Sequence, residues 1–187
     1  MSEIRTFGTD KEFITTYTGK KVYPLVMRPQ DIDFLDIAHA LSNKCRFTGH
    51  TSKFYSVAEH SVAIANQGEK EHKFPGVWGL FHDAAEAYLP DIAGPIKHRF
   101  PLLKMVEQLI LVHIKTRFHL RDLVEEEIRA MKQADISAQW WEAKKLLPVF
   151  SNVQEPQPFE IPIYCWSPEK AEEEFIKIGR EFLFNYL

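Results

Sequence analysis

Apolar residues recur with helical spacing along most of this 187-residue chain, and prolines and glycines separate the periodic stretches. Ile37, Leu41 and Cys45, for example, are spaced four residues apart, which places them on one face of a helix. Such a chain buries its apolar stripes by packing helix against helix. We therefore predict an all-α fold of about six helices. The predicted helices cover residues 31–45, 55–67, 77–88, 102–118, 122–147 and 168–184.

The N-terminal region departs from this pattern. Phe13–Tyr17 and Lys21–Val26 are rich in β-branched and aromatic residues and flank a Thr18-Gly19 turn. These features predict one small β-hairpin. Five prolines between residues 148 and 168 predict a loop before the last helix.

The chain contains no internal repeat and no linker that would divide two cores. We therefore predict one domain over residues 1–187. Within it, residues 1–30 are expected to be extended and residues 31–147 to form the helical core. Residues 148–187 are expected to form a loop and the C-terminal helix.

Composition limits the partners that the chain is expected to bind. The 23 Lys and Arg residues against 26 Asp and Glu residues give a formal net charge of −3. Nucleic-acid polymers and anionic membranes attract proteins with a strong basic excess, so we expect neither as a partner. Cys45 and Cys165 are too few for a disulfide framework, and the N-terminus lacks an apolar secretory signal. We expect a cytoplasmic protein.

Ionisable residues interrupt three of the apolar helical stretches. His82, Asp83 and Glu86 lie within LFHDAAEAY at 80–88, His60 lies within SVAEHSVAI at 56–64, and Asp135 lies between Ala134 and Ile136. Burying such groups costs several kcal/mol unless something compensates their charge. A divalent cation compensates it by taking neutral imidazoles and carboxylates as ligands. The sequence therefore predicts a metal site between helices.

The order of His60, His82-Asp83 and Asp135 resembles the metal-binding pattern of the HD-domain metal-dependent phosphohydrolases. Three flanking segments resemble the branch that contains bacterial 5'-deoxynucleotidases and phage dATP triphosphohydrolases. They are CRFTGHTSKFYSVAEHSV (45–62), HDAAEAY (82–88) and PDIAGPIK (90–97). The resemblance extends over residues 31–138, more than half of the chain, and implies a single HD-domain helical bundle.

The resemblance implies the ligands of one divalent metal ion, which are His60, His82, Asp83 and Asp135. The implied ion is a transition metal, Mn, Co, Fe, Ni or Zn, and a triphosphate substrate could bring additional Mg. Two neutral imidazoles and two carboxylates would leave the loaded site formally neutral, so an anionic substrate is not repelled.

Further residues match positions that handle the substrate in this family. Glu86 is expected to hydrogen-bond the attacking water or a phosphate-bound proton. Asp91 is expected to act near the scissile ester oxygen, either as a general acid or through a water. The implied substrate-binding residues are Arg46 at the phosphate or sugar, Lys97 at a phosphate, Phe47 at the deoxyribose, and Pro95 in the base pocket. Phe47 stands where family members often have Trp, and Arg46 offers the planar fork that suits phosphate.

The implied reaction is hydrolysis of the 5' phosphate ester of a 2'-deoxynucleotide. We favour a dATP triphosphohydrolase that releases deoxynucleoside and tripolyphosphate, and the alternative is a 5'-deoxynucleotidase acting on monophosphates. A non-catalytic regulator that binds a metal or a nucleotide is a further alternative, although it would not need Glu86 and Asp91. The expected partner is a small-molecule nucleotide. The chain is also expected to form a homo-oligomer, with Trp140 and Trp141 as a candidate contact.

Overall fold

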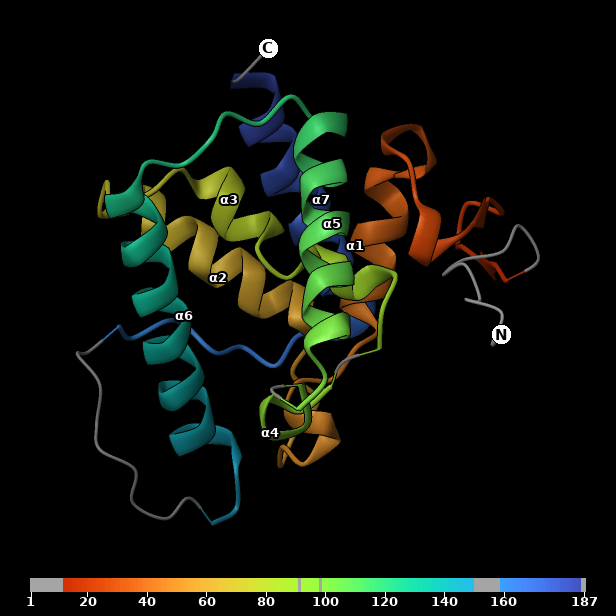
Figure 1. Cartoon of the computed structure of the whole chain (residues 1–187). Coiled ribbons are helices and arrows are strands. Elements are labelled where there is room, and N and C mark those ends of the chain that lie inside the picture. The colour runs from red at the N-terminus through yellow and green to blue at the C-terminus, as the bar shows by residue number, and fades with distance from the viewer. Residues whose placement is uncertain (1–11, 91, 98, 150–158, 186–187) are drawn as a thin grey trace.

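A computed structural model describes residues 12–90, 92–97, 99–149 and 159–185 (Figure 1). Near the N-terminus, β1 (Ile14–Thr15) and β2 (Lys21–Val22) pair antiparallel, with Ile14 opposite Val22. The turn between them contains Gly19 at φ +82°, a backbone conformation that glycine adopts without steric cost. The predicted β-hairpin is confirmed.

The rest of the described chain is helical. Six α-helices there have six residues or more, as predicted, and a four-residue helix lies between the third and fourth of them. Their bounds are α1 (Phe34–Ser42), α2 (Val57–Lys70), α3 (Gly76–Phe81), α4 (Gly94–Lys97), α5 (Pro101–Arg117), α6 (Glu125–Leu146) and α7 (Pro168–Asn185). Short 3-10 turns cover Pro24–Val26, Pro29–Asp31, Phe47–Gly49 and Ala84–Ala87. The all-α class with a small β-hairpin is therefore confirmed.

Side-chain caps fix the starts of the helices that carry the core. The Asp33 carboxylate accepts a hydrogen bond from the Leu35 backbone N–H at 2.9 Å, at the start of α1. The Ser56 hydroxyl accepts one from the Glu59 backbone N–H at 3.0 Å, at the start of α2. Such caps satisfy backbone donors that the helix itself leaves unpaired.

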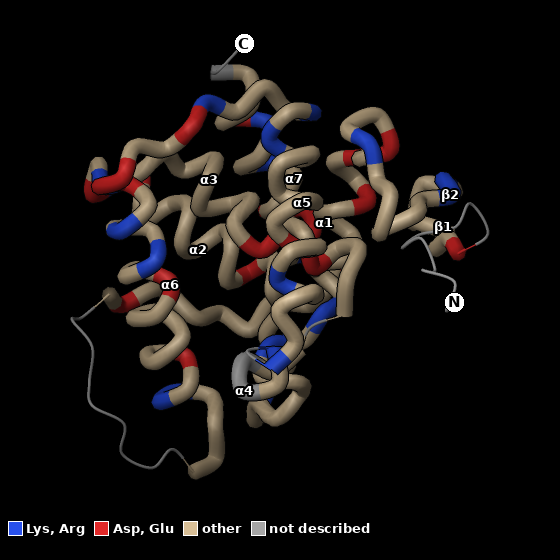
Figure 2. The backbone as a smooth tube through the Cα atoms, viewed as in Figure 1, with Lys and Arg blue, Asp and Glu red and all other residues tan. Residues whose placement is uncertain are grey.

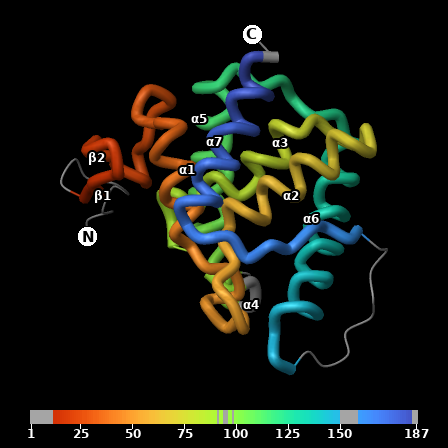
Figure 3. The backbone as a smooth tube through the Cα atoms, turned by 180° about the vertical axis from the view of Figure 1, so that it is seen from behind, coloured from red at the N-terminus to blue at the C-terminus, as the bar shows by residue number. Residues whose placement is uncertain are grey.

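The main core lies where α1, α2, α3 and α7 pack together (Figures 1 and 3). Phe81 and Phe175 are fully buried at its centre. A smaller apolar cluster joins α2 to α6 and to the segment at 159–161. The helix α6 therefore stands beside the main core and contacts it through α2.

A glycine allows α2 and α3 to approach closely. A Cβ atom built at Gly79 would lie 2.8 Å from the Ala65 Cα and 2.9 Å from the Ala65 backbone nitrogen. Those distances are shorter than any real carbon contact, so only glycine permits this spacing of the two helices.

The observed helix ends differ from the predicted ones by at most three residues, except at the end of α3. The prediction that Gly68 ends the second helix is wrong, because α2 continues to Lys70 and the Phe74 ring fills the space where a Cβ would stand. The helix predicted over residues 77–88 ends at Phe81. Asp83 follows with φ −101° and ψ 9°, and a 3-10 turn begins at Ala84.

Acidic and basic residues are interspersed along the elements (Figure 2). The helix α5 buries Ile110 and Ile114, whereas Leu102 and Leu109 are 45% and 42% exposed. Within the described chain, no helix combines the length and apolar character needed to cross a bilayer.

Candidate metal centre and adjoining pocket

The four predicted metal ligands come from three different elements. His60 lies in α2 and is fully buried, while His82 and Asp83 directly follow the last residue of α3. Asp135 lies in the middle of α6. Packing of α6 against α2 brings Asp135 to the end of α3.

Four side-chain atoms converge between these elements. The His60 Nε2 atom lies 3.3 Å from the His82 Nε2 atom and 3.2 Å from the Asp135 Oδ1 atom. The His82 Nε2 atom lies 3.3 Å from the Asp83 Oδ2 atom and 3.7 Å from the Asp135 Oδ1 atom. The His60 Nε2 atom and the Asp83 Oδ2 atom are 4.0 Å apart.

The end of α3 explains how two consecutive residues reach one point. Neighbours in a regular α-helix diverge by about 100° around the axis, so they do not share a face. Because the helical conformation stops between His82 and Asp83, both side chains turn toward α2.

Each imidazole is held by its other nitrogen. The His82 Nδ1 atom lies 2.7 Å from the Gly79 carbonyl oxygen, and the His60 Nδ1 atom lies 2.6 Å from the Glu142 Oε1 atom. When each Nδ1–H donates to its acceptor, each Nε2 lone pair faces the cluster. Histidine ligands of metals are typically held in this way.

The charges of the cluster shift the pKa values of its members. Burial disfavours the charged form of His82, but the carboxylates of Asp83 and Asp135 outweigh burial and raise the His82 pKa well above its usual value. Burial also opposes ionisation of Asp83, yet the neighbouring His82 lowers the Asp83 pKa to about 2. The cluster is therefore strongly attractive to positive charge.

These distances fit a metal ion. Ligand atoms placed about 2.1 Å from an ion at angles of 90–109° are about 3.0–3.4 Å apart. Three of the five distances fall in that range, and the others correspond to wider angles. His60, His82 and Asp83 form a compact group that could hold a metal ion. The Asp135 carboxylate lies next to this group, 3.2 Å from the His60 Nε2 atom.

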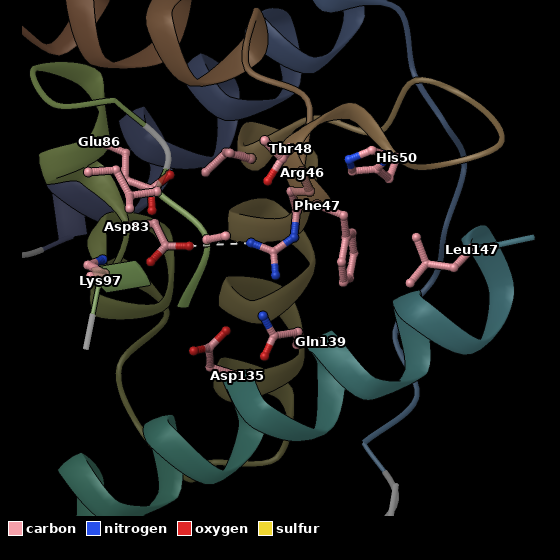
Figure 4. Close-up of a pocket in the computed structure, with 13 residues that line it drawn as sticks. Arg46, Phe47, Thr48, His50, Asp83, Glu86, Lys97, Asp135, Gln139 and Leu147 are labelled. Atoms are coloured by element: carbon pink, nitrogen blue, oxygen red, sulfur yellow. Dashed lines mark hydrogen bonds and ion pairs between the residues drawn. The ribbon is translucent and has the colours of Figure 1, made fainter. Parts of the chain in front are cut away.

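A pocket of about 470 Å³ opens beside the cluster, within the size range of small-molecule sites. Asp83 and Asp135 belong to its wall (Figure 4). Four further predicted site residues line it, which are Arg46, Phe47, Glu86 and Lys97. The structure therefore brings the predicted substrate residues of the described chain to the same pocket as the carboxylates of the cluster.

The two basic residues of the pocket are held by carboxylates. The Arg46 Nε atom donates to the Glu142 Oε2 atom at 2.9 Å, and the Arg46 Nη1 atom lies 3.5 Å from the Asp83 Oδ2 atom. The Lys97 Nζ atom donates to the Glu107 Oε1 atom at 2.6 Å. Asp91 and the side chain of Pro95 lie outside the described residues.

A strained turn forms one wall of the pocket. Phe47, Thr48 and Gly49 have φ values of 54°, 53° and 78°, so three consecutive residues adopt the left-handed conformation. For Thr48, which is β-branched, this conformation is a genuine outlier. Such strain persists where the surrounding structure over-determines it, often at functional sites.

Sequence reasoning missed two residues of α6. Gln139 lines the pocket, one turn after Asp135, and Glu142 is fully buried, two turns after Asp135. Spacings of four and seven residues place both on the helix face that carries Asp135. That spacing was the signal that could have identified them.

Glu59, whose role the sequence did not assign, connects α2 to the C-terminal segment. Its carboxylate accepts hydrogen bonds from the backbone N–H groups of Tyr164, Cys165 and Trp166 at 2.7, 2.9 and 2.7 Å. The Trp141 indole donates to the Ile161 carbonyl at 3.1 Å. Both contacts attach residues 159–167 to the helices of the site.

Comparison with known proteins gives two relatives. The chain is 39% identical over 117 residues to Uncharacterized protein YfdR of Escherichia coli. This match covers 63% of this chain and 64% of YfdR. It is 31% identical over 139 residues to Uncharacterized protein RCAP_rcc00048 of Rhodobacter capsulatus, which covers 69% of this chain and 70% of that protein. The chain thus spans slightly less than two thirds of the length of YfdR. No protein-family model matches the chain.

An identity above 30% that extends over more than two thirds of a relative reflects common descent and a common fold. The chain therefore belongs to the same protein family as RCAP_rcc00048 of Rhodobacter capsulatus.

Proposed function

We propose that this protein is an HD-type, metal-dependent phosphohydrolase that cleaves the 5' phosphate ester of 2'-deoxynucleotides. The observation that carries the proposal is the convergence of two imidazole nitrogens and two carboxylate oxygens at the wall of a pocket that also contains Arg46. A site for a cation beside a fixed guanidinium suits a phosphate ester.

His60, His82, Asp83 and Asp135 would hold the cation. A divalent ion there would supply charge screening and lower the pKa of a bound water toward about 7. Arg46 directs a guanidinium edge into the pocket, where it can donate to two phosphate oxygens. Lys97 adds a point charge on the opposite side of the pocket from Phe47 (Figure 4).

Glu86 lines the pocket on the same side as Asp83 (Figure 4). Its carboxylate would accept a proton from a water that attacks phosphorus. In that reaction the water oxygen bonds to phosphorus, the bond from phosphorus to the 5' oxygen breaks, and the leaving oxygen takes a proton. Asp91 remains our candidate for the donor of that proton.

We favour dATP as the substrate, with deoxynucleoside and tripolyphosphate as products. One observation favours a 5'-deoxynucleotidase as the second candidate. The described pocket lining carries two basic side chains against the carboxylates of Asp83, Glu86 and Asp135, so a divalent cation changes its formal charge from −1 to +1. That charge suits a monophosphate dianion, whereas a triphosphate would bring additional Mg²⁺ to balance its charge.

The test is a panel of deoxy- and ribonucleotide mono-, di- and triphosphates, incubated with Mn²⁺, Co²⁺ or Mg²⁺ and with EDTA. Chromatography identifies the products, so tripolyphosphate from dATP supports the triphosphohydrolase and hydrolysis confined to monophosphates supports the nucleotidase. Glu86→Gln should abolish turnover while the metal stays bound, and Glu126→Gln on the exposed first turn of α6 is the control. No turnover of any nucleotide with any metal would reject the proposal.

A further inference from the structure

Glu142 is a buried carboxylate that three groups of the described chain contact. It receives hydrogen bonds from the Arg46 Nε atom at 2.9 Å and from the Tyr55 hydroxyl at 2.9 Å, and it lies 2.6 Å from the His60 Nδ1 atom. Its side chain has no exposed surface. Burying an uncompensated carboxylate costs several kcal/mol, so these contacts are needed for the fold to contain it.

We propose that Glu142 is a positioning residue that fixes the metal-facing nitrogen of His60 and the pocket-facing edge of Arg46 at the same time. The inference rests on the proposed function to the extent that it requires the cluster to bind a cation. Glu142 itself lies behind His60 and Arg46, away from the pocket lining.

Glu142 determines which ring nitrogen of His60 carries the proton. A neutral imidazole carries its proton on one ring nitrogen and a lone pair on the other. Because a carboxylate only accepts hydrogen bonds, Glu142 selects the form of His60 with the proton on Nδ1. The lone pair of Nε2 then faces Asp135 and His82, where a cation would bind.

The two histidines of the cluster differ in the group that accepts the hydrogen bond from Nδ1. His82 is held in the same form by the neutral carbonyl oxygen of Gly79, at 2.7 Å. The carboxylate at His60 makes a charge-assisted hydrogen bond, which is stronger and raises the ligand basicity of the ring further. Of the two imidazoles, His60 therefore depends more on the residue behind it.

Glu142 also orients the guanidinium of Arg46. Its Nε edge is occupied by Glu142, and its Nη1 atom faces Asp83 at 3.5 Å. Figure 4 shows the guanidinium pointing between Asp83 and Gln139. One carboxylate thus fixes the spacing between a metal ligand and the basic group that would contact the phosphate.

Glu142→Gln tests the inference because the amide keeps the size of the side chain but places either a donor or a weaker acceptor at Nδ1. We expect its affinity for Zn²⁺ or Co²⁺, measured by competition with a chromophoric chelator, to fall by roughly 10–100-fold. The matched control is Glu59→Gln, which makes the same chemical change at a second buried glutamate of the site region. Glu59 contacts the backbone of residues 164–166 and should leave metal affinity unchanged.

A measurement on the unaltered protein covers the case in which Glu142→Gln does not fold. A long-range proton–nitrogen correlation spectrum of the metal-free protein in EDTA, at a pH where the ring is neutral, should show the His60 proton on Nδ1. A proton on Nε2, or equal metal affinity of folded Glu142→Gln and the unaltered protein, would overturn the inference.

The outcomes separate this inference from the proposed function. Tight metal binding that is weakened by Glu142→Gln, with no nucleotide hydrolysed, would reject the function and support the role of Glu142. Hydrolysis with metal affinity insensitive to Glu142→Gln would reject the role of Glu142 alone. An unaltered protein that binds no divalent metal would reject both.

Discussion

The Nε2 atoms of His60 and His82 face each other at 3.3 Å, while their Nδ1 atoms are occupied by Glu142 and Gly79. Two lone pairs at that distance repel unless a positive charge lies between them. We therefore expect divalent cations to stabilise the fold. An ion at one hundred times its dissociation constant adds about 2.7 kcal/mol, which corresponds to roughly 5–10 °C in Tm for a chain of this size.

Differential scanning fluorimetry with Mn²⁺, Co²⁺, Ni²⁺ or Zn²⁺, each compared with EDTA, measures this shift. His82→Ala is the control and should show little dependence on metal. Equal Tm values for the unaltered protein in all these conditions would contradict the metal site.

The histidines of the cluster predict that the stability of the metal-free protein decreases with rising pH, whereas its metal affinity increases. A group whose pKa is raised by folding stabilises the fold fully below its unfolded pKa, about 6.5 for His, and this contribution is lost as the pH rises through the folded pKa. Burial lowers the His82 pKa, but Asp83 and Asp135 raise it by more. We therefore expect the cluster to stabilise the metal-free protein more at pH 6 than at pH 8.

Metal affinity should change in the other direction, because protons compete with the cation for the imidazoles. Zn²⁺ affinity by chelator competition should therefore increase from pH 6 to pH 8. The Tm of the unaltered protein minus the Tm of His82→Ala, both measured in EDTA at each pH, gives the contribution of the cluster. A Zn²⁺ affinity that is independent of pH over this interval would show that the imidazoles are not ligands.

Glu59 predicts a loss of stability that is independent of the metal. Its replacement by alanine removes the acceptor of three backbone N–H groups, and each buried donor left unpaired costs about 1–3 kcal/mol. Because the segment is partly open to water, we expect a loss of roughly 2–4 kcal/mol in the free energy of unfolding, measured by urea denaturation in EDTA. Glu160→Ala, at an exposed glutamate of the same segment, should change stability by less than about 0.5 kcal/mol.

The left-handed turn predicts opposite effects of two neighbouring substitutions. Thr48→Gly removes a strain of about 1–2 kcal/mol but adds freedom to the unfolded chain, so stability should stay equal or rise by up to about 1 kcal/mol. Gly49→Ala adds a methyl group where no atom lies within 4 Å, yet its φ of +78° makes the change destabilising by about 1 kcal/mol.

Urea denaturation of both variants measures this difference, and the same variants can be compared in the nucleotide panel. Because Thr48 lines the pocket, its replacement should weaken substrate binding although the fold is not destabilised. A Thr48→Gly variant less stable than Gly49→Ala would show that the turn is not strained.

The residues of the His and Asp cluster could be singled out from the sequence because each stands out from its neighbours. His60 and Asp135 interrupt apolar helical stretches, and a charge without a nearby partner in such a stretch implies a partner from elsewhere in the fold. Glu142 did not stand out in this way. Lys144 and Lys145 follow it closely, so this part of α6 reads as a solvated, charged helix.

Helix ends were predicted less well where tertiary contacts outweigh local signals. Gly68 is a typical helix terminator, but the ring of Phe74 needs the space beside it and α2 continues. The end of α3 at Phe81 carries no glycine or proline signal. It follows from the fold, in which His82 and Asp83 must both face α2.

The contact of Gly79 with Ala65 has a consequence for ion selectivity. Gly79 lies on α3 beside α2, which carries His60, and its carbonyl oxygen holds the ring of His82. If the cluster binds a cation as proposed, the spacing of the two backbones would limit the ionic radius that the two imidazoles can enclose. A single methyl group at position 79 would push α3 outward and shift preference from Zn²⁺ toward the larger Cd²⁺. Gly79 would then limit the size of the bound ion without contacting it.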